Sequence, residues 1–207
     1  MKTLFVVLLL MIIGTGSAIF SQTVTIGTQV WMTKNLDVST FRNGDPILQV
    51  KSNEEWIKAG KDGKPAWCYY KNKKKNGKKY GKLYNWHAVN DSRGLAPTGC
   101  HIPTDAEWTI LSAYLGGEDA AGKKMKSTSG WNDEGNGTNS SGFSGLPGGT
   151  RGKSGYCSSI GSFGYWWSAS EYDTSYAYSR SLYGNIDFLF RDGYSKEGGL
   201  SVRCLRD

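Results

Sequence analysis

The sequence has few of the residues that most metal and acid–base sites require. Its 207 residues include only two histidines, His87 and His101, and four cysteines, with no C-x-x-C pair. Structural zinc sites usually combine closely spaced cysteines and histidines, so we expect none here. A hydrolytic triad is equally weakly indicated, because both histidines fit structural roles. We expect no catalytic residues, although sequence alone does not decide the geometry of such sites.

Long hydrophobic runs are also scarce, and the one run, from Leu4 to Ile13, is too short for a transmembrane helix, which needs about 20 apolar residues. Lys2 precedes it and small residues follow it, the pattern of a secretory signal peptide. No cysteine follows the run, so a lipoprotein anchor is not predicted. We expect a signal peptide over residues 1–21 and a single domain over 22–207 with no transmembrane segment. The protein would then be secreted or extracytoplasmic.

Export would place four cysteines in an oxidising compartment. They are Cys68, Cys100, Cys157 and Cys204. An even number of cysteines in an exported chain predicts disulfides. Two disulfides are therefore expected, and the count alone leaves three pairings open.

Positive charge is in excess, with a formal net charge of +7. Much of it is local, because "KNKKKNGKK" (71–79) carries six lysines around Asn76-Gly77. That dipeptide lies between two strand-like segments and predicts a solvated hairpin tip. The alternative is a patch for anionic surface sugars or phosphates. Nucleic acid is not an expected partner of an exported protein.

The stretch "CHIPTDAEWTIL" combines a histidine, two carboxylates and a cysteine, and it raises the question of a catalytic site. Thr104 and Glu107 have the spacing of a capping box, in which each side chain bonds the other's backbone N–H. Asp105 falls in the first turn, where the helix dipole favours an anion. A buried stripe follows over 108–115, and Gly116-Gly117 ends the helix. We therefore interpret this stretch as a helix start.

Other segments indicate short strands and one long loop. Thr23–Met32 predicts an edge strand or hairpin, and 176–183 alternates with period two, as strands do. Ser52 with Glu55 marks a second capped helix. Residues 123–155 are rich in Gly, Ser, Asn and Thr, with aromatic residues recurring among them. We expect this region to be a long folded loop, and no internal repeat is evident.

Seven segments occur in order along the chain: "AWCYY", "YGKLYNWHAVND", "GLAPTGCHIPTDAEWTILSAYLGG", "AGKKMKS", "SGFSGLPGGTR", "GYWWSASEYDTSYAYSRSL" and "LSVRCLRD". Together they resemble one known family, the Fibrobacter succinogenes major paralogous domain, a group of secreted bacterial modules. The resemblance implies a location at a bacterial cell surface or in a periplasm. The resemblance covers about residues 24–207. It implies an α+β fold like that of C-type lectins and formylglycine-generating enzymes, with small twisted antiparallel sheets, one or two helices and long loops.

The resemblance also implies a disulfide pairing. The two cysteines usual in the family match Cys68 and Cys204, whereas the family has tryptophan at the position of Cys100 and no regular cysteine at Cys157. We therefore expect Cys68 to pair with Cys204, and Cys100 with Cys157, closing the long loop.

The function implied is that of a non-catalytic module that binds a glycan or a cell-surface protein through its loops. Aromatic density supports this, because aromatic side chains offer flat apolar faces with polar edges. Neighbouring Trp166 and Trp167 must point to opposite faces of a strand, so we expect one of them outside the core. With Trp131 and Arg180 it would border a shallow ligand surface.

Two alternatives remain. The loop "WNDEGNGTN" places Asn132, Asp133, Glu134 and Asn136 close together, and oxygen-rich loops suit calcium, which would make the protein a calcium-dependent, lectin-like binder. The partner loop of C-type lectins is absent, however, and Asx turns explain the same residues. No other cofactor is expected. The second alternative is an oxidase similar to formylglycine-generating enzymes, which hold copper with two late cysteines.

Overall fold

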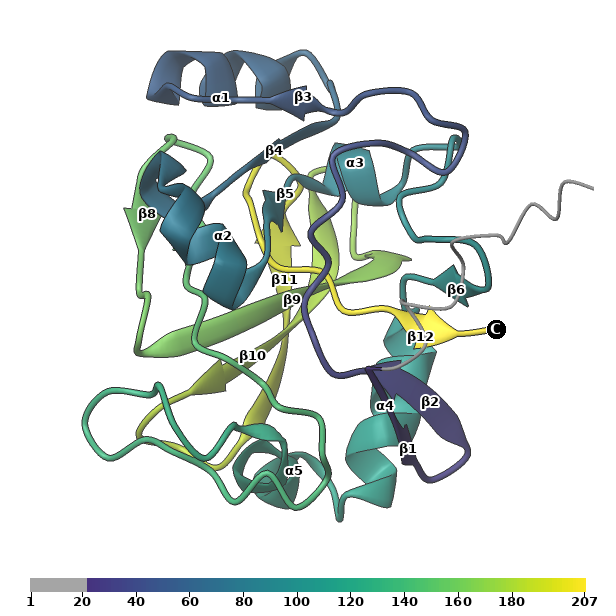
Figure 1. Cartoon of the computed structure of the whole chain (residues 1–207), viewed down its shortest axis with the longest axis vertical. Coiled ribbons are helices and arrows are strands. Elements are labelled where there is room, and N and C mark those ends of the chain that lie inside the picture. The colour runs from purple at the N-terminus through teal and green to yellow at the C-terminus, as the bar shows by residue number, and fades with distance from the viewer. Residues whose placement is uncertain (1–21) are drawn as a thin grey trace, which may run out of the picture.

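The computed structural model describes residues 22–207, and the predicted signal peptide lies outside them (Figure 1). Within the described residues a single 3-10 turn at Tyr70–Asn72 and five α-helices alternate with short strands. The helices are α1 (Asn53–Lys61), α2 (Lys74–Tyr80), α3 (Trp86–Val89), α4 (Asp105–Tyr114) and α5 (Glu118–Met125). The prediction of one or two helices was too low. No helix in residues 22–207 has the length and apolar character needed to cross a membrane.

The strands form four small sheets instead of one large one. Their orders are β1-β2-β12-β6, β11-β10-β9, β3-β4-β5 and β7-β8. All pairs are antiparallel except β3 with β4, which is parallel. The fold is therefore mixed α/β with several small sheets. The strands are β1 (Thr23–Ile26), β2 (Gln29–Met32), β3 (Leu48–Gln49), β4 (Ala66–Cys68), β5 (Leu83–Tyr84), β6 (Cys100–His101), β7 (Thr150–Arg151), β8 (Cys157–Ser158), β9 (Phe163–Glu171), β10 (Tyr176–Tyr183), β11 (Leu189–Ser195) and β12 (Leu205–Arg206).

The central sheet, β11-β10-β9, separates two hydrophobic clusters. Trp166 belongs to the cluster that contains Trp108 and Leu111 of α4, while its neighbour Trp167 belongs to the cluster around Trp86. Neighbouring strand residues point to opposite faces, and here each face meets a separate core. Figure 1 shows β9 and β10 crossing the middle of the molecule, with α4 and α5 below them.

Both predicted capping boxes are present. The Thr104 hydroxyl accepts the Glu107 N–H at 3.3 Å, and the Glu107 carboxylate accepts the Thr104 N–H at 2.8 Å. Ser52 and Glu55 make the same reciprocal pair at the start of α1. These helix starts were predictable because a capping box depends only on residues three apart in the chain.

The lysine-rich segment differs from the prediction, because Asn76-Gly77 lies inside helix α2 and not at a hairpin tip. The chain turns earlier, at Lys71 and Asn72, which have φ angles of 51° and 54°. Gly77 faces the ring of Tyr69 so closely that a Cβ atom would overlap it. The glycine therefore permits close helix packing, and the hairpin prediction was wrong.

The long loop is folded, as predicted. Its aromatic residues Trp131 and Phe143 are buried, at 5% and 0% exposure. Lys126, at the end of α5, is buried as well and donates to the carbonyl oxygens of Tyr183, Gly184 and Ile186. The loop is thus tied to the turn between β10 and β11.

Candidate functional site

The three tryptophans predicted to border a ligand surface are all buried. Trp166 and Trp167 have no exposed area, and Trp131 is 5% exposed. Each indole N–H also has an acceptor inside the protein, such as Asn35 Oδ1 at 2.9 Å for Trp166 and Tyr84 O at 2.7 Å for Trp167. The expectation that one of the pair lies outside the core was wrong, because clusters cover both faces of the central sheet.

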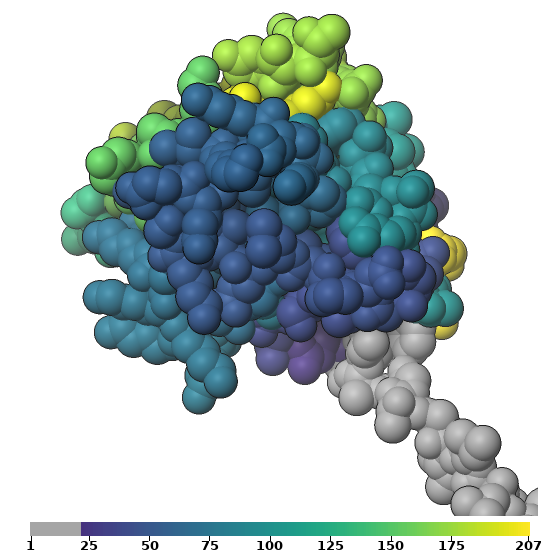
Figure 2. All heavy atoms as spheres, turned by 90° about the horizontal axis from the view of Figure 1, so that it is seen from above, coloured from purple at the N-terminus to yellow at the C-terminus, as the bar shows by residue number. Residues whose placement is uncertain are grey.

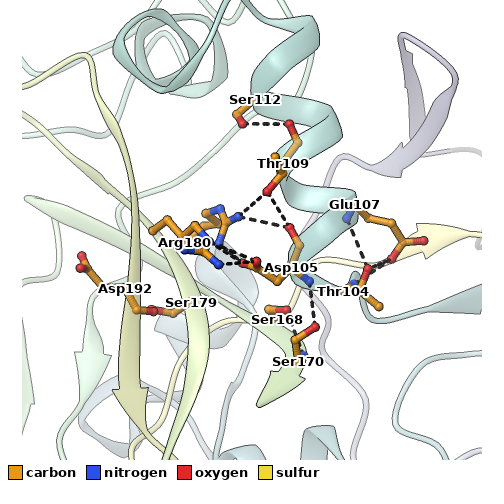
Figure 3. A network of polar contacts seen from close by, with 11 residues as sticks. Thr104, Asp105, Glu107, Thr109, Ser112, Ser168, Ser170, Ser179, Arg180 and Asp192 are labelled. Carbon is orange, nitrogen blue, oxygen red and sulfur yellow. Dashed lines mark hydrogen bonds and ion pairs between the residues drawn. The ribbon is translucent and has the colours of Figure 1, made fainter. Parts of the chain in front are cut away.

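Arg180, the fourth residue of that predicted surface, is also buried. Its guanidinium donates to Asp105 Oδ1 at 2.6 Å and to Thr109 Oγ1 at 3.2 Å (Figure 3). Arg191 donates to the same Asp105 carboxylate at 2.8 Å. Burial raises the pKa of Asp105, but hydrogen bonds from Arg191 and Arg180 outweigh it, so the pKa lies below its usual value. The network fastens the start of α4 to β10 and β11, which is a structural task.

His101 is held between two carboxylates. Its Nε2 lies 2.8 Å from Glu107 Oε1 and its Nδ1 lies 2.7 Å from Asp207 Oδ1. The other oxygen of Glu107 is occupied by the capping box with Thr104. Both ring nitrogens and both Glu107 oxygens therefore have partners within the protein. The stretch "CHIPTDAEW" therefore links β6, α4 and the end of β12.

The four cysteines are grouped differently from the predicted pairs, and none is bonded to another. Cys68 lies in the cluster against which Cys157 packs, while Cys100 and Cys204 share the cluster around Trp86. The predicted pairs, Cys68 with Cys204 and Cys100 with Cys157, would each have to join two different clusters. Cys157 and Cys204, the pair that a copper-dependent oxidase would need, lie in different clusters too.

The Asn-rich loop uses part of its oxygen set internally. Asn136 Oδ1 accepts the N–H of Trp131 at 3.1 Å, and Asp133 and Glu134 occupy the left-handed region, with φ angles of 52° and 58°. Among residues 22–207 no group of three His, Cys, Asp or Glu side chains could hold a metal ion. Calcium also uses amide and carbonyl oxygens, so calcium binding by Asn132 and its neighbours stays a prediction.

A surface groove runs between α2 and this loop. One hollow, of about 460 Å³, lies between Lys75 and Lys79 of α2 and Asn132 of the loop. A second, of about 400 Å³, continues from Asn132 to Phe163 and Asn185. Because Asn132 lines both hollows, we treat them as one feature and call it the α2 groove.

Glycine contacts shape the middle of the α2 groove. The Asn132 N–H donates to Gly161 O at 2.7 Å, and a Cβ atom at Gly161 would overlap the Asn132 side chain. Gly135 meets Gly184 in the same way, with a Cβ at 135 falling 2.5 Å from the Gly184 Cα. The loop can therefore lie directly against the ends of β9 and β10. This contact brings residues from three distant segments to one groove.

The charge beside the α2 groove is not neutralised. None of the six lysines of segment 71–79 lies within 4.0 Å of a described carboxylate, although twelve ion pairs occur elsewhere in residues 22–207. Figure 2 shows the blue atoms of this segment projecting from the body of the molecule. Lys75 and Lys79 line the groove, with Lys79 Nζ 5.0 Å from the ring centre of Tyr80.

A row of three aromatic rings begins at Phe163, at the far end of the α2 groove. Phe163 stacks on Tyr183 with ring centres 4.3 Å apart, and Tyr183 stacks on Phe190 at 4.4 Å. All three are half-buried, and they come from β9, β10 and β11 in turn. Their stacked rings join the three strands beside the groove.

A family profile described as the Fibrobacter succinogenes major domain matches residues 24–206, almost all of the described chain. The chain belongs to this family. No curated protein and no solved structure matches it. The α2 groove of this Fibrobacter succinogenes major domain is lined by residues from segments 75–80, 130–133, 160–163 and 184–185.

Sequence reasoning found part of the α2 groove and missed the rest. It singled out the lysines and the Asn-rich loop separately, and the structure brings Lys75, Lys79 and Asn132 together. It overlooked Phe163, the first residue of β9, and Asn185, which lies 22 positions later in the turn after β10. Only the pairing of β9 with β10 brings them together, and no local sequence pattern predicts the register of these two strands.

Proposed function

We propose that this domain is a non-catalytic binding module for an acidic glycan, and that the α2 groove is its binding site. The observation that carries the proposal is the set of six lysines without carboxylate partners beside a groove lined by amide and aromatic side chains. Unpaired positive charge next to a concave surface attracts anions and raises their local concentration.

The composition of the α2 groove fits sugars with carboxylate or sulfate groups. Lys75 and Lys79 supply ammonium groups for the charge. Asn132, Asn185 and Ser162 supply donors and acceptors that match hydroxyl groups. Asp133 is the one carboxylate among the lining residues. We propose further that binding takes place outside the cytoplasm, in keeping with the signal-peptide pattern of residues 1–21.

The test is isothermal titration of the protein with a polyuronate, such as polygalacturonate, and with a neutral glucan of similar length. We expect the polyuronate to bind and the neutral glucan not to bind. Raising the ionic strength from about 0.05 M to about 0.5 M should weaken binding, because it shortens the screening length.

Two double variants separate the α2 groove from simple net charge. Lys75→Ala/Lys79→Ala removes the groove lysines, and Lys74→Ala/Lys78→Ala removes the same charge from another face of α2. We expect the first to weaken polyuronate binding about tenfold, equivalent to ~1.4 kcal/mol, and the second to weaken it much less. Equal losses in both variants would mean that the charge acts without the groove, and the proposal would fail.

The calcium-dependent alternative is tested in the same titrations. The loop of Asn132, Asp133, Glu134 and Asn136 would be its site, and chelation of calcium would then abolish binding. The proposal made here expects the same affinity with calcium and with a chelator. An affinity that requires calcium and is lost in Asp133→Ala would favour the lectin-like alternative.

A further inference from the structure

The four cysteines lie at two separate places, two at each. Cys68 and Cys157 lie where β4 meets the β7-β8 hairpin. Cys100 and Cys204 lie where β6 meets β12. Three of the four are buried, and Cys157 is half-exposed.

At the first place, several contacts surround the two sulfur atoms. Cys157 Sγ accepts the backbone N–H of Lys71 at 3.3 Å, which ties it to the segment just after Cys68. Arg151 lies opposite Cys157 in the β7-β8 pair. Burial raises the pKa of the Cys68 thiol to about 12, against a smaller lowering by charge and a hydrogen bond from Arg151. The charge of Cys157 also raises the pKa of Cys68, so the two sulfur atoms lie close enough to interact.

Arg151 supplies an independent observation at this place. It is 1% exposed, and its Nη1 atom has no hydrogen-bond partner. Its other guanidinium nitrogens donate to Gly155 O at 2.8 Å and to Ser52 O at 2.7 Å. A buried guanidinium N–H without an acceptor is costly. The charge of Arg151 lowers the pKa of Cys68, which places this guanidinium beside the Cys68 sulfur.

At the second place, strand register brings the sulfurs together. Arg206 pairs with Cys100 across β12 and β6. Cys204 lies immediately before β12, two residues from Arg206, and it shares a buried cluster with Cys100. The two cysteines line one hollow of about 290 Å³, and the charge of Cys100 raises the pKa of Cys204 further above the value that burial gives it.

We propose that the folded chain carries two disulfides in an oxidising compartment, Cys68–Cys157 and Cys100–Cys204. Each joins segments that already touch. The first closes the chain between β4 and β8, and the second fastens the last strand to β6. Neither requires the domain to bind a glycan.

Each bond needs a disulfide oxidant, such as oxidised glutathione or a thiol–disulfide oxidoreductase. At the first place the more exposed Cys157 thiolate attacks the oxidant and forms a mixed disulfide, releasing one thiolate. The Cys68 thiolate, next to Arg151, then attacks the Cys157 sulfur and releases the second. Two protons leave the cysteines and two electrons pass to the oxidant, so one protein disulfide forms for each oxidant disulfide reduced.

Peptide mapping tests the pairing directly. The purified chain is unfolded and reduced, refolded in a buffer of reduced and oxidised glutathione, alkylated and digested with trypsin without reduction. The four cysteines fall on separate peptides, residues 62–71, 94–123, 154–180 and 204–206. We expect 62–71 linked to 154–180, and 94–123 linked to 204–206. Any other linkage, or four alkylated thiols, would overturn the proposal.

Two single variants check that the pairs are independent. In Cys157→Ser we expect Cys68 to be alkylated while the peptide of Cys100 stays linked to that of Cys204. In Cys100→Ser we expect the opposite result. If Cys157→Ser instead freed Cys100, the crossed pairing would be correct and this one wrong.

The rate of oxidation provides a second readout. Burial holds the pKa of the Cys68 thiol well above its usual value, so little Cys68 thiolate is present at pH 8. Oxidised glutathione added to the folded, reduced protein should therefore close the Cys68–Cys157 bond more than about tenfold more slowly than it does during refolding. Equal rates would show that Cys68 is not held in the buried position described here.

Discussion

Lysines in two regions of the domain have opposite surroundings. Lys82, Lys126 and Lys196 have side chains only 2% to 9% exposed, and each has an ion pair as well as backbone carbonyl acceptors. The six lysines of segment 71–79 have no ion pair with any described carboxylate. The comparison shows that the number of lysines says little about function. Their partners separate the structural cations from those available to a ligand.

Lys126→Met should have the largest effect on stability. It removes the charge that satisfies three carbonyl oxygens and pairs with Asp187 at 3.4 Å. Breaking such a buried group should lower the free energy of unfolding by about 3 kcal/mol, measured by urea denaturation. Lys123→Met is the control, because Lys123 pairs with the same carboxylate but is 58% exposed. It should cost less than ~0.5 kcal/mol, and equal costs would contradict the comparison.

Lys196→Met should have an intermediate effect. Its ammonium group bonds the Glu171 carboxylate and the carbonyl oxygens of Asp173 and Thr174 at 2.8 to 3.0 Å. These partners lie on exposed residues, so water can replace the lysine. We expect a loss of about 1.5 kcal/mol in urea denaturation. A loss as large as that of Lys126→Met would show that partner exposure does not set the cost.

His101 is a cation only while its ring is protonated, so it lies between the two classes of lysine. Burial lowers its pKa, but hydrogen bonds to Asp207 and Glu107 outweigh this and raise it above the usual value. The stabilisation from protonated His101 is therefore fully present below the unfolded pKa of about 6.5 and is lost as the pH rises through the higher folded pKa.

The pH dependence gives the measurement for this residue. The free energy of unfolding of the native protein should fall between about pH 6 and pH 8 relative to that of His101→Gln, by less than ~1 kcal/mol because the ring is partly exposed. Glu107 stays charged over this pH range. Its pKa lies below the usual value despite burial, mainly because its carboxylate accepts the Thr104 backbone N–H. Identical pH profiles for the two proteins would show that His101 is neutral in the folded state.

Lys74→Ala/Lys78→Ala should have the smallest effect, and with the opposite sign. The two lysines lie four apart on α2, where like charges repel. Removing them should raise the free energy of unfolding by ~0.3 kcal/mol at low salt, and added salt should erase the gain. A clear loss of stability would mean that these lysines have structural partners after all.

Local features of the fold were predictable from the sequence, and features set by distant contacts were not. The caps at Ser52 and Thr104 follow from residues three apart. Helix α2 was missed because Gly77 serves the packing of Tyr69, a contact that no turn rule contains. The cysteine groups depend on which strands pair, and the family pattern alone suggested a different pairing.

The candidate site shows the same limit. Lys75, Lys79 and Asn132 come from segments that sequence analysis noticed, but their meeting depends on glycine contacts between the loop and the strand ends. The aromatic prediction failed for a related reason. Alternation correctly placed Trp166 and Trp167 on opposite faces, but it gave no sign that the central sheet is covered on both sides.

The burial of the tryptophans has a spectroscopic consequence. All eight tryptophans of the chain are 5% exposed or less, so their emission in the folded protein should be that of indole shielded from water. Unfolding will expose all of them together and shift the emission strongly to longer wavelengths. A sugar in the α2 groove will contact none of these indole rings. Tryptophan fluorescence will therefore report denaturation of this domain closely but will change very little when the ligand binds.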